Sequence, residues 1–157
     1  VDLKSVIWAA PGFQKNYTES KLSIFAVGYL KNQVNSVPIG YGTLIPDRNI
    51  PVSGILHESD LHQSKRCPDG RRLFRLMVPH SRWDGDEQSI LTCAESLLAE
   101  QPELFAKIGE RRIPQYPPGY MNEIAQMDYD CSYVGWSVSG VSITHVVDEA
   151  ERVAELF

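Results

Sequence analysis

The end of the chain restricts the fold more than any other segment. The run 131–134 has the composition of a short strand, and Gly135, a tight connection and Gly140 follow it. From Val141 onward, apolar residues recur at helical spacing to the end of the chain. They are Val141, Ile143, Val146, Val147, Ala150, Val153, Ala154 and Phe157. The chain is therefore predicted to end as a strand, a glycine-bounded turn and an amphipathic helix.

The middle of the chain is predicted to be rich in strands. Runs of β-branched and aromatic residues alternate with turn sequences such as 47–49 and 67–70, which is typical of antiparallel strands. The predicted strands cover residues 21–31, 40–46, 52–58, 71–79 and 111–116. An earlier apolar run, Ser5–Ala10, stops at a Pro-Gly pair. Such short apolar runs are typical of strands buried on both faces, as in a parallel sheet.

The hydrophobic period changes after Asp84. Helical spacing predicts a helix over 86–99, with acidic side chains near its start. Pro102 is expected to begin a second short helix that ends near Gly109. In the terminal helix, Asp148 and Arg152 are expected to pair on the solvent-facing side. The predicted fold class is α+β, derived from α/β: an antiparallel sheet with helices, plus the terminal strand, turn and helix.

Size and composition exclude several classes of protein. A length of 157 residues is typical of one domain, and a net charge of −5 argues against a nucleic-acid binder. No apolar stretch reaches the roughly 18 residues that cross a bilayer, and the chain shows no secretory leader. Three widely spaced cysteines are typical of reduced thiols. A cytoplasmic protein is expected, attached at most to a membrane surface.

The polar clusters of the sequence do not make a metal site. The segment 57–62 resembles a zinc-protease helix, but its second histidine comes one residue too late. The acidic segment 84–87 lacks the later residues of a calcium loop and is better interpreted as a helix start. Basic residues surround Cys67, namely Lys65, Arg66, Arg71 and Arg72. They are interpreted as a solvated loop, or alternatively as a contact for substrate carboxylates or an anionic surface.

Three segments resemble one family in the right order. Residues 6–11 are similar to a strand of flavin-containing amine oxidoreductases that leads out of the flavin domain. Residues 40–46 with 54–56 and Pro114-Gln115-Tyr116 are similar to a series found in protoporphyrinogen oxidases of that superfamily. Residues 133–141 resemble the terminal flavin-contacting motif. The chain is thus similar to the C-terminal part of a protoporphyrinogen oxidase.

The resemblance implies that different segments of the chain belong to different domains of the enzyme. Residues 1–12 would be the exit strand of an FAD-binding domain, 13–127 a substrate-binding sheet with helices, and 128–157 the terminal strand, turn and helix of the FAD-binding domain. One compact unit is expected. The implied cofactor is FAD, and the implied contacts are Gly135, Trp136, Gly140 and Val141. The implied activity is oxidation of a porphyrinogen-type substrate, and no catalytic residue is assigned.

The chain differs from the family in one respect that affects activity. It contains no Gly-x-Gly-x-x-Gly phosphate loop. We therefore expect the chain alone to bind FAD poorly and to be inactive as a partial flavoenzyme. Its apolar faces would be covered by a separate N-terminal FAD-binding segment or by self-association. The alternative is a non-catalytic binding or assembly module that keeps the fold without flavin chemistry.

Overall fold

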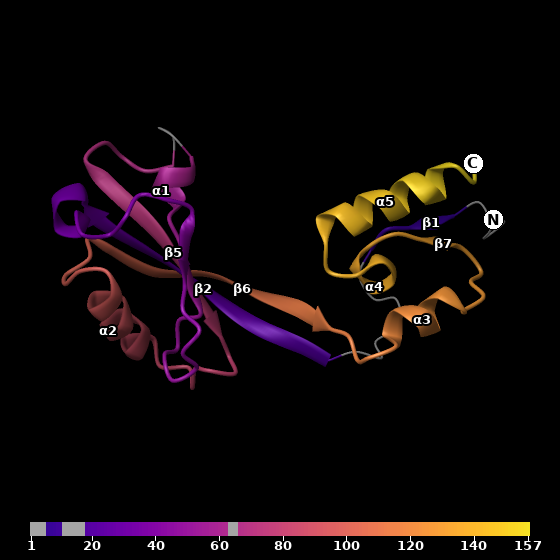
Figure 1. Cartoon of the computed structure of the whole chain (residues 1–157), viewed down its shortest axis with the longest axis horizontal. Helices are drawn as coiled ribbons and strands as arrows, with labels where there is room; N and C mark the ends of the chain where they lie inside the picture. Colours follow the sequence, from indigo (N-terminus) through magenta and orange to yellow (C-terminus); the bar gives the residue numbers. More distant parts are fainter. Residues whose placement is uncertain (1–5, 11–17, 63–65) are drawn as a thin grey trace. The chain divides into compact units, whose positions relative to one another are not determined.

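The structure, a computed structural model shown in Figure 1, describes residues 6–10, 18–62 and 66–157. It divides into two compact units: unit 1, Val1–Glu19 with Ile113–Phe157, and unit 2, Ser20–Arg112. From the sequence, one compact unit was expected, with segment boundaries after residues 12 and 127. The observed division falls within two long strands, β2 (Thr18–Leu30) and β6 (Leu104–Gln115).

Unit 2 is built on a five-stranded sheet with the order β3-β4-β5-β2-β6. β3 (Gly42–Leu44) pairs antiparallel with β4 (Gly54–Leu56), and β4 pairs antiparallel with β5 (Arg71–Pro79). β5 in turn pairs antiparallel with β2, from Leu22 opposite Pro79 to Leu30 opposite Arg71. The predicted fold class, with an antiparallel sheet in the middle of the chain, is confirmed.

The core of unit 2 lies between the sheet and α2 (Glu87–Leu97). Residues 22–27 of the inner strand β2 are all buried, whereas β5 alternates buried and part-exposed side chains. α2 begins at Asp86, whose carboxylate accepts hydrogen bonds from the amides of Gln88 (3.1 Å) and Ser89 (3.0 Å). The predicted helix and its acidic start are confirmed. The core residues are Phe25, Val27, Tyr29, Val34, Ile45, Val52, Ile55, Phe74, Leu76, Val78, Ile90, Ala94 and Leu98.

The helix predicted from Pro102 to Gly109 is wrong. This segment enters β6, the strand next to β2. The amide of Glu103 donates to the carbonyl of Gly28 at 2.8 Å. A Cβ on Gly28 would lie 3.1 Å from the Cβ of Leu104, so the missing side chain allows the strands to approach closely. Pairing with an available sheet edge thus overrides the local helix signal.

Two short helices fix the loops of unit 2. The 3-10 helix η2 (Lys31–Val34) follows β2 directly, and α1 (Glu58–Leu61) follows β4. The strand predicted over 52–58 is therefore shorter than expected. α1 brings Asp60 and Ser59 beside the start of β5, where the Leu73 amide donates to Ser59 Oγ at 3.1 Å.

Unit 1 contains two short strands and three helices among its described residues. β1 (Ile7–Trp8) pairs in parallel with β7 (Ser132–Tyr133). α3 (Tyr120–Ala125) precedes β7, and α4 (Trp136–Ser139) and α5 (Ile143–Ala154) follow it. The predicted terminal strand, turn and helix are confirmed, and the connection itself contains the short helix α4.

The strand β1 is exposed, contrary to the expectation of a strand buried on both faces. Ile7 is 49% exposed and Trp8 is 46% exposed. The parallel pairing expected for this run is present, but β7 is its one partner in the described part of the sheet. With so few neighbours, the two side chains remain open to solvent. None of the described helices is both long and apolar enough to cross a membrane.

Candidate functional site

The turn after β7 depends on two glycines. Gly135 has φ 134° and ψ −178°, and Gly140 has φ 91° and ψ 168°. This region of backbone space is essentially restricted to glycine. Gly135 begins α4 and Gly140 ends it, and a Cβ on Gly135 would meet no heavy atom within 4 Å. The two glycines therefore produce a sharp turn whose backbone is open at Gly135.

Two tyrosines hold the carbonyl groups of α4. The Tyr120 hydroxyl donates to the carbonyl of Ser137 at 2.9 Å, and the Tyr116 hydroxyl donates to the carbonyl of Trp136. The two tyrosine rings stack with centroids 4.6 Å apart and planes 6° apart. Sequence reasoning used Tyr116 for the family resemblance and did not assign it this role. A tyrosine directly before a proline-rich break is the signal that could have indicated this contact.

The N-terminus of α5 follows this turn and is suited to an anion. Ser142, the N-cap residue, makes no side-chain capping hydrogen bond, and the first turn holds no acidic residue. Helices leave their first amides without internal partners and carry a partial positive charge there. The amides that follow Ser142 are therefore left for solvent or for a ligand with negative charge.

An open cavity of about 700 Å³ lies against this turn. Residues 138–142 line it, together with Met121 from α3 and with His145, Asp148, Glu149 and Arg152 from α5. A second cavity of about 520 Å³ shares Met121, Val138, Glu149 and Arg152 with it. Two of the predicted contact residues, Gly140 and Val141, line the larger cavity, whereas Gly135 and Trp136 do not.

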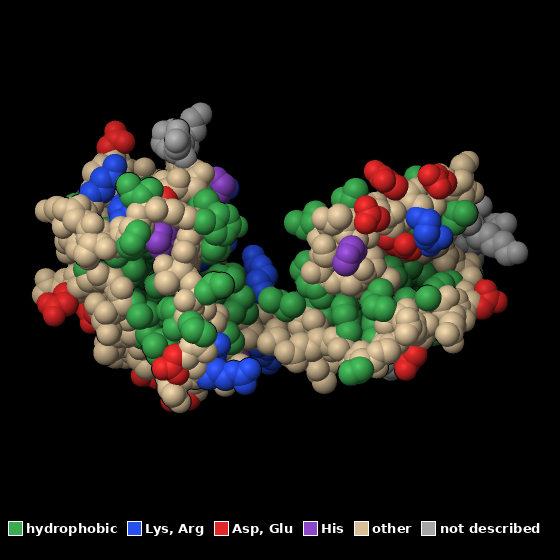
Figure 2. All heavy atoms as spheres, in the orientation of Figure 1, with side chains coloured by type: hydrophobic (Ala, Val, Ile, Leu, Met, Phe, Trp, Pro, Cys, Tyr) green, Lys and Arg blue, Asp and Glu red, His purple; other side chains and the backbone are tan. Residues whose placement is uncertain are grey.

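The exposed side of α5 is acidic. Figure 2 shows acidic side chains gathered over this helix around one basic side chain. Arg152 is bound to Glu149 through bonds of 2.7 and 3.0 Å, which raises the pKa of Arg152. The predicted pair of Asp148 with Arg152 is wrong, because the carboxylate of Glu149, three residues away, accepts from both Nε and Nη2 of Arg152. An anionic ligand is therefore favoured at the N-terminal turn of α5 rather than along this side.

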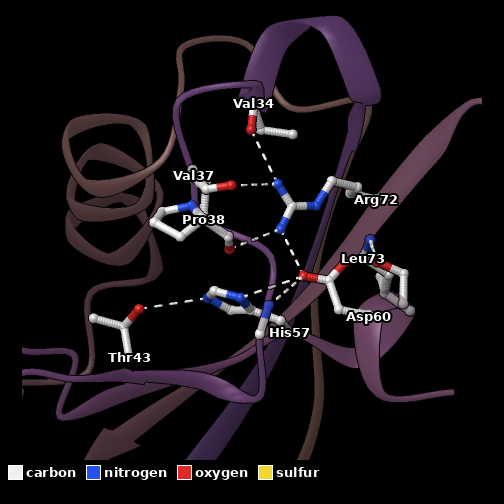
Figure 3. Close-up of polar contacts among 10 residues, drawn as sticks. Val34, Val37, Pro38, Thr43, His57, Asp60, Arg72 and Leu73 are labelled. Carbon is white, nitrogen blue, oxygen red and sulfur yellow. Dashed lines mark hydrogen bonds and ion pairs between the residues drawn. The ribbon is translucent and has the colours of Figure 1, made fainter.

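Unit 2 contains a buried polar cluster that sequence reasoning did not find (Figure 3). Arg72 Nη1 donates to the carbonyls of Val34 (3.0 Å) and Val37 (2.8 Å). Its Nη2 donates to the carbonyl of Pro38 (3.3 Å) and to Asp60 Oδ2 (2.7 Å). The Arg72 side chain is 8% exposed and that of Asp60 is 9% exposed. The cluster thus fastens the loop after η2 to α1 and β5.

His57 extends this cluster toward β3. Its Nδ1 lies 3.5 Å from Asp60 Oδ2, and its Nε2 lies 3.4 Å from Thr43 Oγ1. Burial lowers the pKa of His57 below its ordinary value, and the nearby Arg72 acts in the same direction against Asp60. Burial alone would raise the pKa of Asp60, but hydrogen bonds from Arg72 and the Gly40 amide lower it. His57 is therefore held neutral beside an Arg–Asp ion pair.

The cluster is not arranged as a metal centre. Across the described residues, no group of three or more His, Cys, Asp or Glu side chains is placed to hold a metal ion. The three cysteines, Cys67, Cys93 and Cys131, are free thiols. The basic residue Arg72, grouped with the Cys67 loop in the sequence analysis, is a buried structural cation rather than part of a solvated loop.

Several solved structures share the fold of this chain, although no family model and no curated protein matches it. One is a candidate protoporphyrinogen oxidase from Exiguobacterium sp. 255-15, with a TM-score of 0.64 and 14% identity over 90% of this chain. Another is a reduced UDP-galactopyranose mutase, with a TM-score of 0.66 and 14% identity over 90% of this chain. The chain spans 35% and 34% of the lengths of these two proteins.

These comparisons establish the fold of the chain. It is built like about a third of each of two larger proteins, and one of them bears the name of the enzyme that the sequence motifs resemble. An identity of 14% is too low to carry a function from one protein to the other.

Proposed function

We propose that this chain is part of a flavin-dependent oxidoreductase, and that its glycine-bounded turn contacts the flavin. The observation that carries the proposal is the junction of Gly140 with the uncapped N-terminus of α5, which lines an open cavity. Bound flavin would supply the redox chemistry. The backbone of Gly140 and Val141 would hold the edge of its ring system. Gly135 and Trp136 would contribute further contacts from the start of the turn.

The fit of this turn to a flavin is partial. The cavity is open, and the first turn of α5 beside it holds no acidic residue. The positive end of the helix dipole there suits the edge of a flat, electron-accepting ring. The sequence holds no Gly-x-Gly-x-x-Gly loop for a pyrophosphate. We therefore expect weak FAD binding by these 157 residues and no turnover without a partner that supplies that loop.

The substrate and setting follow from the family resemblance alone. A porphyrinogen-type molecule would lie against the sheet of unit 2 in the complete enzyme. A cytoplasmic location, with attachment to a membrane surface, would suit such a hydrophobic substrate. The partner would be an N-terminal FAD-binding segment or a second copy of the chain, which would make the protein a homo-oligomer.

A flavin titration tests the proposed contact. The absorption bands of FAD are followed while the purified chain is added, and the same titration is run with Gly140→Val. Valine places a branched side chain where the backbone conformation favours glycine and the cavity begins. We expect a saturable band shift with the natural chain and its loss with the variant. No shift at millimolar protein would contradict the proposal.

A second candidate function, a non-catalytic assembly module, is favoured by the exposed apolar side chains of unit 1. Ile143 is 81% exposed and Val147 is 49% exposed on α5, and Trp8 is 46% exposed on β1. Exposed apolar patches often mark interaction surfaces. Light scattering combined with the flavin titration separates the two functions, because an assembly module would associate through these side chains without any flavin band shift. Replacing Ile143 and Val147 with glutamate would then abolish the association.

A further inference from the structure

The sheet of unit 2 has a second face, opposite the face that packs against α2. Successive side chains of a strand point to opposite faces of a sheet. On β5, Phe74 and Leu76 belong to the core, so Arg75 and its neighbours two residues away point to the second face. In the register of the sheet, Ala26 of β2 and Leu56 of β4 lie beside Arg75. Three adjacent strands therefore contribute side chains to this second face.

The second face is apolar on both sides of Arg75. The two neighbouring rows of side chains are Leu44, Gly54, Met77 and Ile24 in one, and Leu73 and Gly28 in the other. Since Gly28 has no side chain and Ala26 has only a methyl group, the face is low along β2. At the edges of the face, Leu44 is 88% exposed, and Leu104, which lies against Gly28, is 45% exposed. Open apolar surface of this kind often marks a binding site, and its low middle leaves room for a ring system.

Arg75 has a donor that a ligand can reach. Its Nη2 donates to the carboxylate of Glu58, and its Nε is buried without a hydrogen-bond partner. Its Nη1 makes no hydrogen bond with a described residue and is not among the buried unpartnered atoms, so this nitrogen is open to solvent. The Arg75 side chain as a whole is 33% exposed. One guanidinium nitrogen therefore remains for an acceptor from outside the chain.

The charges around Arg75 favour an anionic acceptor. Glu58 binds two arginines, Arg75 and, at 3.2 Å, Arg66, and neither arginine pairs with another described carboxylate. Two cations and one carboxylate leave a net charge of +1 (2 − 1). The Glu58 side chain is 7% exposed, so its carboxylate is largely covered. At the end of the same face, Arg71 is paired with Glu103 at 2.6 Å and adds no net charge.

We propose that this second face binds an apolar ring compound through its carboxylate. Arg75 Nη1 donates a hydrogen bond to the carboxylate, and the ring lies over the neighbouring Ala26 and Leu73. Both parts of the ligand matter, because an exposed ion pair alone contributes little, whereas a charge-assisted hydrogen bond beside apolar surface is stronger. The inference rests on the proposed function in that it takes this face as the substrate side of the enzyme, and it names a carboxylate as the group of the substrate that is held.

The experiment follows the fluorescence anisotropy of two ring compounds while the purified chain is added without FAD. Pyrenebutyrate carries a carboxylate, and pyrenebutanol is its uncharged analogue. We expect saturable binding of both compounds, with pyrenebutyrate bound about tenfold more tightly. Equal affinity for the two compounds, or no saturation with either, would overturn the proposal.

Replacement of Arg75 tests the assignment of the donor. Arg75→Gln is expected to lower the affinity for pyrenebutyrate about tenfold and to leave the affinity for pyrenebutanol unchanged. Lys21→Gln is the matched control, because it removes one positive charge from an exposed position of β2 that alternates away from the second face. It should change neither affinity. If pyrenebutyrate keeps its advantage in Arg75→Gln, the assignment is wrong.

A second variant keeps the test decisive if circular dichroism shows that Arg75→Gln does not fold. Arg66→Gln removes the net charge of the cluster at a side chain that is 56% exposed, and it leaves Arg75 in place. The preference for pyrenebutyrate over pyrenebutanol should then fall about threefold. An unchanged preference in Arg66→Gln would refute the charge argument.

The result is separable from that of the flavin titration. A chain that shifts the FAD bands without preferring pyrenebutyrate would contradict this inference and leave the flavin contact standing. A chain that binds pyrenebutyrate through Arg75 without shifting the FAD bands would contradict the flavin contact and leave this inference standing.

Discussion

The two units of this chain bury apolar side chains to very different extents. Unit 2 has a core of thirteen buried residues packed between its sheet and α2. In the described part of unit 1, the buried hydrophobic residues are Tyr120, Ile124 and Val153. Burial of apolar area is the main source of stability. The comparison teaches that unit 2 is stabilised by its own core, whereas unit 1 is held largely by backbone hydrogen bonds and its tyrosine contacts.

This difference has a functional consequence. A region with few buried contacts opens locally at low free energy, and a ligand or partner that binds its folded form stabilises it. Unit 1, which carries the proposed flavin contact, is the region whose order we expect to depend on binding. Unit 2 should remain folded with or without a ligand.

The largest expected effect is that of Arg72→Met compared with Arg152→Met. The first leaves Asp60 buried without its cation, which costs about 3–5 kcal/mol of unfolding free energy. The second breaks an exposed pair on α5 and costs less than about 1 kcal/mol. Urea unfolding followed by circular dichroism measures both. Similar losses for the two variants would show that the units do not differ in burial as described.

Gly140→Ala is expected to have a smaller effect, confined to unit 1. The backbone of Gly140 has φ 91°, and forcing another residue into this region costs about 1–3 kcal/mol. Gly40→Ala is the matched control: a Cβ there meets no heavy atom within 4 Å, and a change within about 0.5 kcal/mol is expected. Hydrogen exchange of the α5 amides measures the loss. Unchanged protection in Gly140→Ala would contradict the account of this turn.

Acidification is expected to weaken unit 2 gradually. The pKa of His57 is lower in the folded chain than its ordinary 6.5, so the unfolded chain binds more protons. This contribution to stability is present above about pH 6.5 and is lost as the pH falls toward the folded pKa. Asp60 stays ionised in this range because its pKa is lowered below 3.8. Urea midpoints between pH 7.5 and 5.5 should fall, and less steeply in His57→Gln. A midpoint that rises on acidification would contradict this sign.

The sequence predicted the elements whose signals are local. Alternating and β-branched runs identified β2 and β5, the acidic start identified α2, and the glycines with the apolar stripe identified the end of the chain. The segment entering β6 was mispredicted because its neighbour in the sheet, β2, lies far away in sequence. No local sequence pattern indicates that the missing side chain of Gly28 leaves room for Leu104.

The candidate site was predicted less completely than the fold. Gly140 and Val141 were assigned as flavin contacts from the family resemblance, and both line the cavity beside the start of α5. The cluster of Arg72, Asp60 and His57 was not predicted, because its members combine only when η2, α1 and β5 meet. Pairing on α5 was also mispredicted, since the choice between Asp148 and Glu149 depends on the Arg152 rotamer rather than on spacing alone.

The most direct test of the proposed flavin contact is a nuclear magnetic resonance titration of the labelled chain with FAD. The account predicts that the amide signals of Gly135, Trp136, Gly140 and Val141 shift progressively, while those of the unit 2 core stay in place. Shifts confined to unit 2, or none at the turn when FAD is in large excess, would contradict it.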